Sequence, residues 1–302
     1  MPQILPKIVA VVGPTASGKS DLAVDLALQF HGEVVSADSR QVYRGMDIGT
    51  GKVTDAEMRG IPHHLLDIAD PMEVVSAGAY KTLADAAIHE ILKRNHLPIL
   101  CGGTGFYIEA VTDGLALPDV PVDIELRKTL SMLSVDELFK MLTAKDPERA
   151  KTIDPKNPHR LIRAIEISAT LGKVPPRKTH PQFETLFIGI ETPNDILRER
   201  IHNRLQKRME QGMLEEAFVL HESGVTWERM EEFGLEYRYL SRHAQVILSR
   251  DEMLSMLETE IVHYAKRQYT WFRRNKAIHW VQLSDTARIV QLVSNFLNGQ
   301  SS

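Results

Sequence analysis

Residues 13–20 read Gly-Pro-Thr-Ala-Ser-Gly-Lys-Ser, a complete G-x-x-x-x-G-K-[ST] pattern. An apolar run from Ile8 to Val12 precedes this segment, and a helical pattern from Lys19 to Phe30 follows it. A phosphate-binding P-loop requires this strand–loop–helix context. The two glycines let backbone N–H groups turn inward, and the helix N-terminus adds positive potential for a di- or triphosphate. The segment therefore predicts a P-loop, but it does not say which phosphate is held.

Each position of the segment has an expected part in holding the phosphate. Lys19 supplies a positive charge, and the hydroxyl of Ser20 suits Mg²⁺. The predicted phosphate-binding residues of this loop are Gly13, Pro14, Thr15, Ala16, Ser17, Gly18, Lys19 and Ser20.

Composition places the 302 residues among ordinary globular proteins, with 43% hydrophobic and 25% charged residues. The formal net charge of −4 excludes a surface coated in positive charge but permits a local basic groove. The single cysteine, Cys101, cannot form an internal disulfide, which fits a reducing cytoplasm. No apolar stretch approaches the length that spans a membrane, so we expect no membrane partner.

Short apolar runs alternate with helical patterns along the chain. Alternation of this kind predicts an α/β fold, with a parallel sheet covered by helices on both faces. Strands are expected at 7–12, 33–37, 64–68, 97–101, 185–191 and 277–281. Helices are expected at 19–30, 76–94, 104–112, 134–144, 159–171, 195–221, 251–272 and 285–298.

The region 117–183 differs from the rest because it lacks strand-like runs and is rich in proline. We interpret it as a helical insertion over the mouth of the sheet, so that residues 1–116 and 184–302 form the core. The alternative, a set of connecting helices packed on that core, stays open.

In open α/β sheets, ligands bind beyond the carboxyl ends of the strands. Asp38 follows the second strand and is either a general base or metal ligand, or a turn cap. Gln41 could pair with an adenine edge, although a solvated amide is the favoured reading. Thr104, after strand 97–101, either contacts a phosphate oxygen or caps the next helix. That strand ends without the acidic residue with which most P-loop NTPases hold Mg²⁺, which argues against an ATPase or GTPase.

The C-terminal third carries a basic, aromatic stretch. No acidic residue occurs from Ile261 to Ser284. Basic residues mixed with aromatics suit contacts to a phosphate backbone and to stacked bases. RNA contact and a solvated helix face both remain open for 263–276, where the basic residues are Lys266, Arg267, Arg273, Arg274 and Lys276. A solvated charged face is favoured for helix 195–221, which carries Arg198, Arg200, Arg204, Lys207 and Arg208.

Six motifs in order resemble the bacterial tRNA dimethylallyltransferase family over residues 7–275. They are the segment 13–20, Ser-Ala-Asp-Ser-Arg-Gln-Val-Tyr at 36–43, Met-Asp-Ile-Gly-Thr at 46–50, Gly-Gly-Thr-Gly-Phe-Tyr at 102–107, His-Arg-Leu-Ile-Arg-Ala at 159–164 and Lys-Arg-Gln-Tyr-Thr-Trp-Phe at 266–272. The resemblance implies a nucleotide-kinase-like core with a helical insertion. It also implies transfer of a dimethylallyl group from dimethylallyl diphosphate to N6 of the adenosine 3′ of the anticodon, in tRNAs that read codons beginning with U.

The same resemblance implies roles for individual residues. Asp38 would be the general base on the adenine amine, Thr15 would donate to the oxygen that bridges prenyl group and diphosphate, and Arg238 would contact the diphosphate. The P-loop would hold that diphosphate with Mg²⁺, and a cytoplasmic monomer is expected. The implied tRNA-contacting residues are Asp38, Ser39, Arg40, Gln41, Thr104, Arg127, His159, Arg160, Leu161, Ile162 and Arg163.

The chain departs from the family pattern at two places. Gly51 stands where alanine is usual, and the segment 233–240, Phe-Gly-Leu-Glu-Tyr-Arg-Tyr-Leu, differs from the commoner Gly-Tyr-(Arg/Lys) form. Three rival functions are a transferase acting on free adenine nucleotide, a small-molecule kinase and a non-catalytic RNA-binding protein. The basic stretch 263–276 argues against the first, the missing acidic residue after strand 97–101 against the second, and the intact P-loop against the third.

Overall fold

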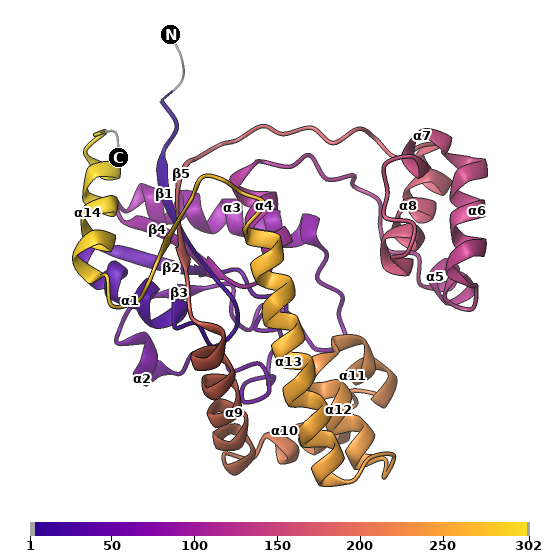
Figure 1. Ribbon diagram of the computed structural model, residues 1–302. Coiled ribbons are helices and arrows are strands. Elements are labelled where there is room, and N and C mark those ends of the chain that lie inside the picture. The colour runs from indigo at the N-terminus through magenta and orange to yellow at the C-terminus, as the bar shows by residue number, and fades with distance from the viewer. Residues whose placement is uncertain (1–3, 301–302) are drawn as a thin grey trace. The chain divides into compact units, whose positions relative to one another are not determined.

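The structure is a computed structural model that describes residues 4–300. The chain divides into two compact units: one runs to Gly114 and resumes at Pro181, and the other is Leu115–His180 (Figure 1). The sequence predicted limits of 117 and 183 for the second unit. No helix among the described residues is long and apolar enough to cross a membrane.

The larger unit is built on one parallel sheet. Within the described residues its order is β3-β2-β4-β1-β5-β6, and every neighbouring pair is parallel, which confirms the predicted α/β class. At the end of β1, Val12 is in register with Gly102 of β4 and Gly189 of β5. The strands are β1 (Lys7–Val12), β2 (Gly32–Ser36), β3 (His63–His64), β4 (Leu97–Gly102), β5 (Glu184–Ile190) and β6 (Ile278–Val281).

Both faces of the sheet are covered by helices because successive strand side chains point to opposite faces. Ile8, Ala10 and Val12 of β1 join one apolar cluster with α3 (Ala77–Lys93) and α4 (Gly105–Thr112). Val9 and Val11 join another with α1 (Lys19–Phe30) and α14 (Thr286–Leu297). A short helix, α2 (Asp55–Met58), lies between β2 and β3 in the chain.

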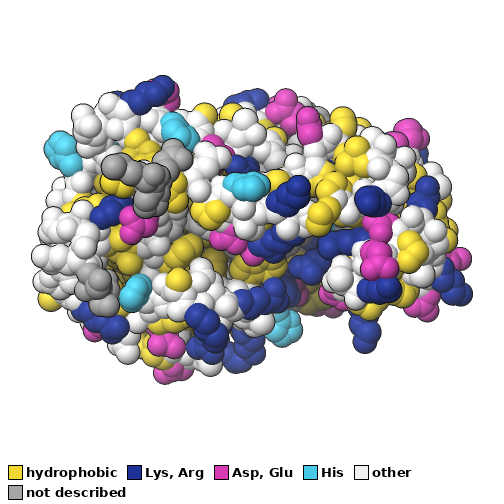
Figure 2. Space-filling view, turned by 90° about the horizontal axis from the view of Figure 1, so that it is seen from above, with side chains coloured by type: hydrophobic (Ala, Val, Ile, Leu, Met, Phe, Trp, Pro, Cys, Tyr) yellow, Lys and Arg dark blue, Asp and Glu magenta, His cyan; other side chains and the backbone are white. Residues whose placement is uncertain are grey.

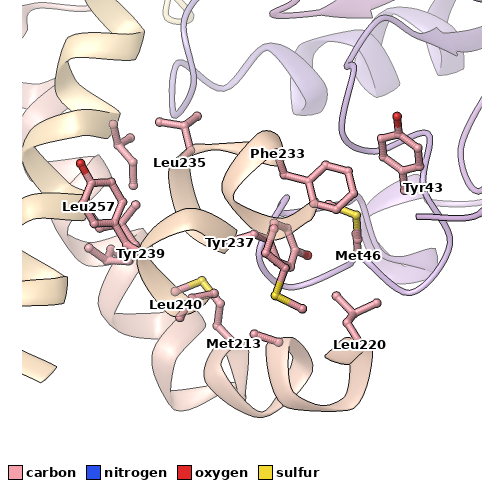
Figure 3. Close-up of a cluster of buried hydrophobic side chains, with 14 of the residues drawn as sticks. Tyr43, Met46, Met213, Leu220, Phe233, Leu235, Tyr237, Tyr239, Leu240 and Leu257 are labelled. Atoms are coloured by element: carbon pink, nitrogen blue, oxygen red, sulfur yellow. The ribbon is translucent and has the colours of Figure 1, made fainter. Parts of the chain in front are cut away.

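The predicted helix 195–221 is wrong as a single element. It is two helices, α9 (Asn194–Glu210) and α10 (Met213–Glu222), because Gly212 adopts a left-handed φ of 96° between them. With α11 (Trp227–Phe233), α12 (Leu235–Ala244) and α13 (Arg250–Phe272) these helices form a separate apolar cluster. Tyr43 and Met46, from the loop after β2, are part of it (Figure 3). The cluster thereby ties a loop of the sheet to helices far along the chain.

The second unit is helical, apart from an isolated bridge between Leu115 and Thr179. Its helices are α5 (Ile124–Ser131), α6 (Val135–Lys145), α7 (Pro147–Ala150) and α8 (Pro158–Leu171). A capping box of Ser134 and Glu137 begins α6. Leu130, Leu138 and Leu142 are fully buried at its centre, so this unit has a core of its own.

Candidate active site

Three loops meet at the carboxyl edge of the sheet. They follow the adjacent strands β2, β4 and β1, so parallel pairing brings their first residues together. The backbone N–H of Ala37 donates to Cys101 O at 2.8 Å, and the N–H of Thr104 donates back to Ala37 O at 3.1 Å. The loops after β2 and β4 are therefore bonded to each other beside the loop after β1.

The loop after β1 has the conformation that a P-loop requires. Gly18 lies in the left-handed region with φ 89° and immediately precedes α1. Ser17 is fully buried, yet its Oγ has no hydrogen-bond partner among the described residues. A Cβ on Gly13 would lie 3.0 Å from that oxygen. A buried hydroxyl without a partner beside a helix N-terminus fits a loop that receives an anion.

The charge of Lys19 is only partly compensated. Its Nζ donates to Pro14 O at 3.2 Å. Burial lowers the pKa of Lys19. The charges of Cys101 and Asp38 act to raise this pKa, and those of Arg204 and Arg208 lower it further. A diphosphate in the loop would favour the charged ammonium because its oxygens bring negative charge close to it.

Three arginines on one face of α9 point at these loops. Arg200 Nη1 donates to Ser17 O of the P-loop, Arg204 Nη2 to Gly51 O and Arg208 Nη1 to Gly49 O, each at 3.3 Å. Their spacing of four residues places them on one side of the helix. The favoured prediction of a solvated face is wrong for Arg204 and Arg208, because the 49–51 loop lies against them, whereas Arg200 is exposed and reaches Ser17 O from the solvent side. Burial and Arg208 lower the pKa of Arg204 to about 10.

Asp38 caps the turn after β2, as one of its two predicted readings requires, and the reading as a general base or metal ligand stays a prediction. Its Oδ1 accepts hydrogen bonds from the N–H groups of Arg40 at 2.9 Å and Gln41 at 3.4 Å, so it caps the turn. No hydrogen bond from a described residue reaches Oδ2. The carboxylate is half-buried, and its charge acts on Lys19. One oxygen therefore holds the loop, and the other is available to accept a proton.

Thr104 and Gln41 bind neighbouring loops. Thr104 occupies the N-cap position of α4 but makes no side-chain capping bond there. Its Oγ1 accepts from the N–H of Ser39 at 3.0 Å and donates to Ser39 Oγ at 3.3 Å. Gln41 Nε2 donates to Gly51 O at 3.1 Å, so the favoured reading of a solvated amide is wrong. In the described structure both side chains stabilise the arrangement of the loops.

The C-terminal segment divides into a buried face and an exposed face. Gln268 is buried and bonds to two loops, and a Cβ on Gly105 would lie 2.2 Å from Trp271 Cδ1. The exposed side carries Lys266, Arg267, Arg273, Arg274 and Lys276. Arg267 pairs with Glu260 and Arg273 with Glu191, whereas Arg274 lies over the Trp271 ring. Figure 2 shows basic side chains mixed with acidic and apolar ones across a face of the molecule, in keeping with local basic patches.

Arg238 does not belong to the row of arginines on α9. Its Nε and Nη2 donate to Glu231 O at 3.3 and 3.2 Å, and it forms an ion pair with the Glu231 carboxylate at 3.4 Å. A Cβ on Gly234 would lie 3.4 Å from Arg40 Nη2 and 3.5 Å from Arg238 Nη2, which places Arg238 beside Arg40. Arg238 as the diphosphate-contacting arginine stays a prediction, and the guanidiniums that bond to the P-loop and to the 49–51 loop are those of α9.

The tRNA-contacting residues predicted in the second unit differ in exposure. Leu161 is fully buried in the unit's core, so its side chain cannot contact RNA and that prediction is wrong. Arg127 and Arg163 both bond to the buried carboxylate of Glu166. His159 and Arg160 are exposed at the start of α8, and Ile162 is half-buried. Of the predicted residues in this unit, only His159 and Arg160 have exposed polar side chains.

The donor set of the P-loop fits Mg²⁺ held together with a phosphate ligand. No group of three or more His, Cys, Asp or Glu side chains that could hold a metal occurs in residues 4–300. Mg²⁺ commonly keeps several waters and is bound by substrate phosphates with one or two protein oxygens. Ser20, exposed in the first turn of α1, offers such an oxygen.

The sheet, the P-loop and the surrounding cations define an α/β protein of the P-loop class with an anion site at the carboxyl edge. The sequence matches the family described as IPP transferase over residues 41–275. Because this match covers most of the chain, the chain belongs to the IPP transferase family. The prediction made from the six motifs is thereby confirmed.

Relatives and solved structures agree with this assignment. The chain is 44% identical over 285 residues to tRNA dimethylallyltransferase 2 of Citrifermentans bemidjiense, covering 93% of this chain and 92% of the relative. It is 37% identical to the crystal structure of a tRNA isopentenylpyrophosphate transferase from Bacillus halodurans, with a TM-score of 0.73 and coverage of 97% and 96%. A eukaryotic dimethylallyltransferase studied acting on tRNA has 25% identity and a TM-score of 0.84, covering 98% of this chain and 80% of that one.

Proposed function

We propose that the protein transfers a dimethylallyl group from dimethylallyl diphosphate to N6 of the adenosine 3′-adjacent to the anticodon, in tRNAs that read codons beginning with U. The observation that supports this best is the position of Asp38, with Oδ2 unoccupied, beside a P-loop surrounded by cations. We further propose that it acts as a monomer, and in the cytoplasm, a reducing compartment that fits its single free cysteine, Cys101.

Asp38 would act on the nucleophile. The N6 lone pair of adenine is delocalised into the ring, so the amine attacks weakly while it keeps both protons. Accepting one proton on Oδ2 as the new C–N bond forms makes the amine a better nucleophile, an effect worth about 10²–10⁴ in rate. Oδ1, bonded to Arg40 N and Gln41 N, keeps the carboxylate oriented during that transfer.

The P-loop and its neighbours would act on the leaving group. As the allylic C–O bond breaks, negative charge grows on the diphosphate, and preorganised donors stabilise the transition state most where that charge develops. Lys19, the hydroxyl of Thr15 and the guanidinium of Arg204 are the groups we assign to this task. Thr15 and Arg204 line the same small cavity. Mg²⁺, held by Ser20 and the diphosphate, would supply further positive charge to the leaving oxygens.

The RNA would be held by exposed cations. The end of α13 and the turn after it offer Lys266, Arg274 and Lys276, which are exposed and for which no described acidic residue forms an ion pair. Phosphate contacts of this kind give affinity and place the loop, while the target base leaves its stack at a cost of a few kcal/mol. Arg40, which lies over the Tyr264 ring, is close to Asp38 in the same turn and is suited to that base.

The test is product formation by the purified protein. It is incubated with Mg²⁺, dimethylallyl diphosphate and an unmodified anticodon stem-loop, and the digested nucleosides are identified by mass spectrometry. N6-(dimethylallyl)adenosine at the position 3′ of the anticodon is expected. A parallel reaction replaces the RNA with AMP, and another replaces the donor with ATP. Prenylated AMP without prenylated RNA, a phosphorylated acceptor or the absence of any product would overturn the proposal.

A further inference from the structure

Arg208 is buried although it carries a charge. It is 8% exposed, and its Nη1 donates both to Gly49 O and to Glu236 Oε1 at 3.3 Å. Glu236 is itself only 7% exposed. A buried charge that lost its partner would be strongly destabilising. Glu236, on α12, therefore anchors Arg208 beneath the 49–51 loop.

Gly51 leaves the room that this arrangement needs. A Cβ at this position would lie 1.5 Å from Arg208 Nη2 and 2.4 Å from Arg204 Nη2. Both guanidiniums therefore lie against Gly51. Any other residue at position 51 would displace them. Gly51 and Glu236 therefore both lie against Arg208.

The charges around this point do not balance. Two neighbouring guanidiniums share one buried carboxylate, and Glu236 bonds to Arg208 rather than to Arg204. Among the described residues Arg204 donates only to Gly51 O, and Glu57 and Asp38 act on its charge without a hydrogen bond. Both arginines line a small cavity with Thr15 and Ala16 of the P-loop. Arg208 Nη1 bonds to Gly49 O, and its Nη2 approaches Gly51 together with Arg204 Nη2, so the two guanidiniums are neighbours.

We infer, resting on the proposed function, that Arg208 is a positioning residue for the diphosphate site. The ion pair with Glu236 holds Arg208 in place, and the missing side chain of Gly51 leaves room for it. In this position Arg208 keeps the Arg204 guanidinium directed toward the P-loop, where Arg204 contacts the diphosphate. Loss of Arg208 leaves Arg204 free to adopt other rotamers, and a side chain at Gly51 displaces both guanidiniums, so in either case diphosphate binds more weakly. The bond-making step at Asp38 is not affected directly.

A double-mutant cycle between Gly51→Ala and Arg208→Met tests this inference. The measurement is the Kd of the full-length protein for inorganic pyrophosphate with Mg²⁺, by calorimetry, with neither donor nor RNA present. We expect each single variant to raise that Kd about tenfold, consistent with a coupling energy between residues in contact. Gly51→Ala should have a smaller effect in the Arg208→Met background, because the closer of its two clashes is then absent and only the one with Arg204 remains.

Gly60→Ala is the matched control. Gly60 also has a left-handed φ, +80°, but a Cβ there would meet nothing within 4 Å, so this variant carries the backbone strain without the clash. Its Kd for pyrophosphate should equal that of the wild type. Arg208→Lys, which keeps the charge without the planar fork, should recover part of the affinity.

Three results would overturn the inference. The first is an unchanged Kd for pyrophosphate in Arg208→Met. The second is an equal effect of Gly51→Ala in both backgrounds. The third is a lower Tm of Arg208→Met and Gly51→Ala with unchanged Kd, which would mean a purely structural role. Wild-type protein that binds pyrophosphate but makes no prenylated RNA would instead refute the proposed function. The double-mutant cycle, which measures only pyrophosphate binding, could still be interpreted.

Discussion

The side-chain oxygen of Gln268 accepts a hydrogen bond from the backbone N–H of Thr15 at 2.8 Å. The amide nitrogen of the same side chain donates to Gly103 O at 2.9 Å. One buried amide on α13 therefore joins the P-loop to the loop after β4, and a Cβ on Gly103 would lie 2.2 Å from its Nε2. Asparagine and glutamine amides suit such a bridge because they donate and accept at once.

Replacing Gln268 with glutamate should weaken binding of the donor. The new carboxylate cannot donate to Gly103 O, and its negative charge lies beside the site of the diphosphate. Losing one partner of a buried hydrogen bond costs about 1–3 kcal/mol. We expect Gln268→Glu to raise the KM for dimethylallyl diphosphate at least tenfold, and more than Gln268→Ala does. Steady-state kinetics of both variants check this.

Gln291→Glu is the control for that experiment, because Gln291 lies exposed on α14 and bonds only to Asn295. It should have the KM of the wild type. Equal KM values for Gln268→Glu and Gln268→Ala would show that the introduced charge does not reach the diphosphate.

Asp38→Asn should separate the two functions of Asp38. Asparagine keeps an oxygen that can accept from Arg40 N and Gln41 N, so the turn persists, but its amide cannot take a proton. The single-turnover rate with saturating RNA and donor should fall about 10²–10⁴-fold. Asp38→Ala should in addition loosen the turn and raise the Kd for RNA. A single-turnover rate of Asp38→Asn within a few-fold of the wild type would exclude the carboxylate as the base.

The features predictable from the sequence are those that local pattern determines. The bounds of β1 and α1 agree with the predicted 7–12 and 19–30, because a continuous apolar run and a glycine-rich loop are sufficient signals. The break at Gly212 was missed because an isolated glycine in a helical pattern is often tolerated. Helix α12 was also missed, within the segment that departs from the family pattern.

The role of the arginine row on α9 could not be predicted because it depends on tertiary contacts with distant loops. Arginines four residues apart on a charged helix look like a solvated face. Only the backbone carbonyls of Ser17, Gly49 and Gly51, which come from two distant loops, show which face is covered. Likewise, nothing near Arg127 in the sequence indicates that Glu166 would be buried beneath it.

Glu33 should make stability depend on pH far from the site. Burial by itself raises the pKa of this carboxyl, but hydrogen bonds from Arg94, His64 and His96 outweigh burial and lower the pKa to about 2. A lowered folded-state pKa stabilises the fold above the unfolded value of 4.5, and that contribution is lost as the pH falls from 4.5 toward 2.

Glu33→Gln should therefore reduce the free energy of unfolding by about 2–3 kcal/mol at pH 7, and by much less near pH 2. Urea unfolding at both pH values measures this difference. At pH 7 and at urea concentrations below the unfolding transition, kcat of the variant should equal that of the wild type. Glu90→Gln is the matched control, because Glu90 lies exposed on α3 and pairs only with Lys93 in the described structure. An equal loss of stability at both pH values would show that ionisation of Glu33 is not the cause.

Exposed cations at the end of α13 and in the turn after it should contribute to RNA affinity through phosphate contacts. Lys266 and Lys276 are exposed, and no described residue forms an ion pair with either. Each phosphate contact that is removed should reduce the slope of log K against log salt by about 1. The variant Lys266→Ala/Lys276→Ala should therefore bind an anticodon stem-loop more weakly, with a shallower salt dependence and an unchanged Tm.

Lys93→Ala and Arg127→Ala provide the comparison for the double variant. Lys93 is exposed on α3 and should leave both the affinity and the salt slope as in the wild type. Arg127 bonds to Glu166, which is 1% exposed, so its removal leaves a buried carboxylate with one fewer partner. Arg127→Ala should lower the Tm while the salt slope changes little. A reduced salt slope at unchanged Tm for Arg127→Ala would instead return this arginine to the RNA-contacting set, since only a lost phosphate contact changes the number of released counterions.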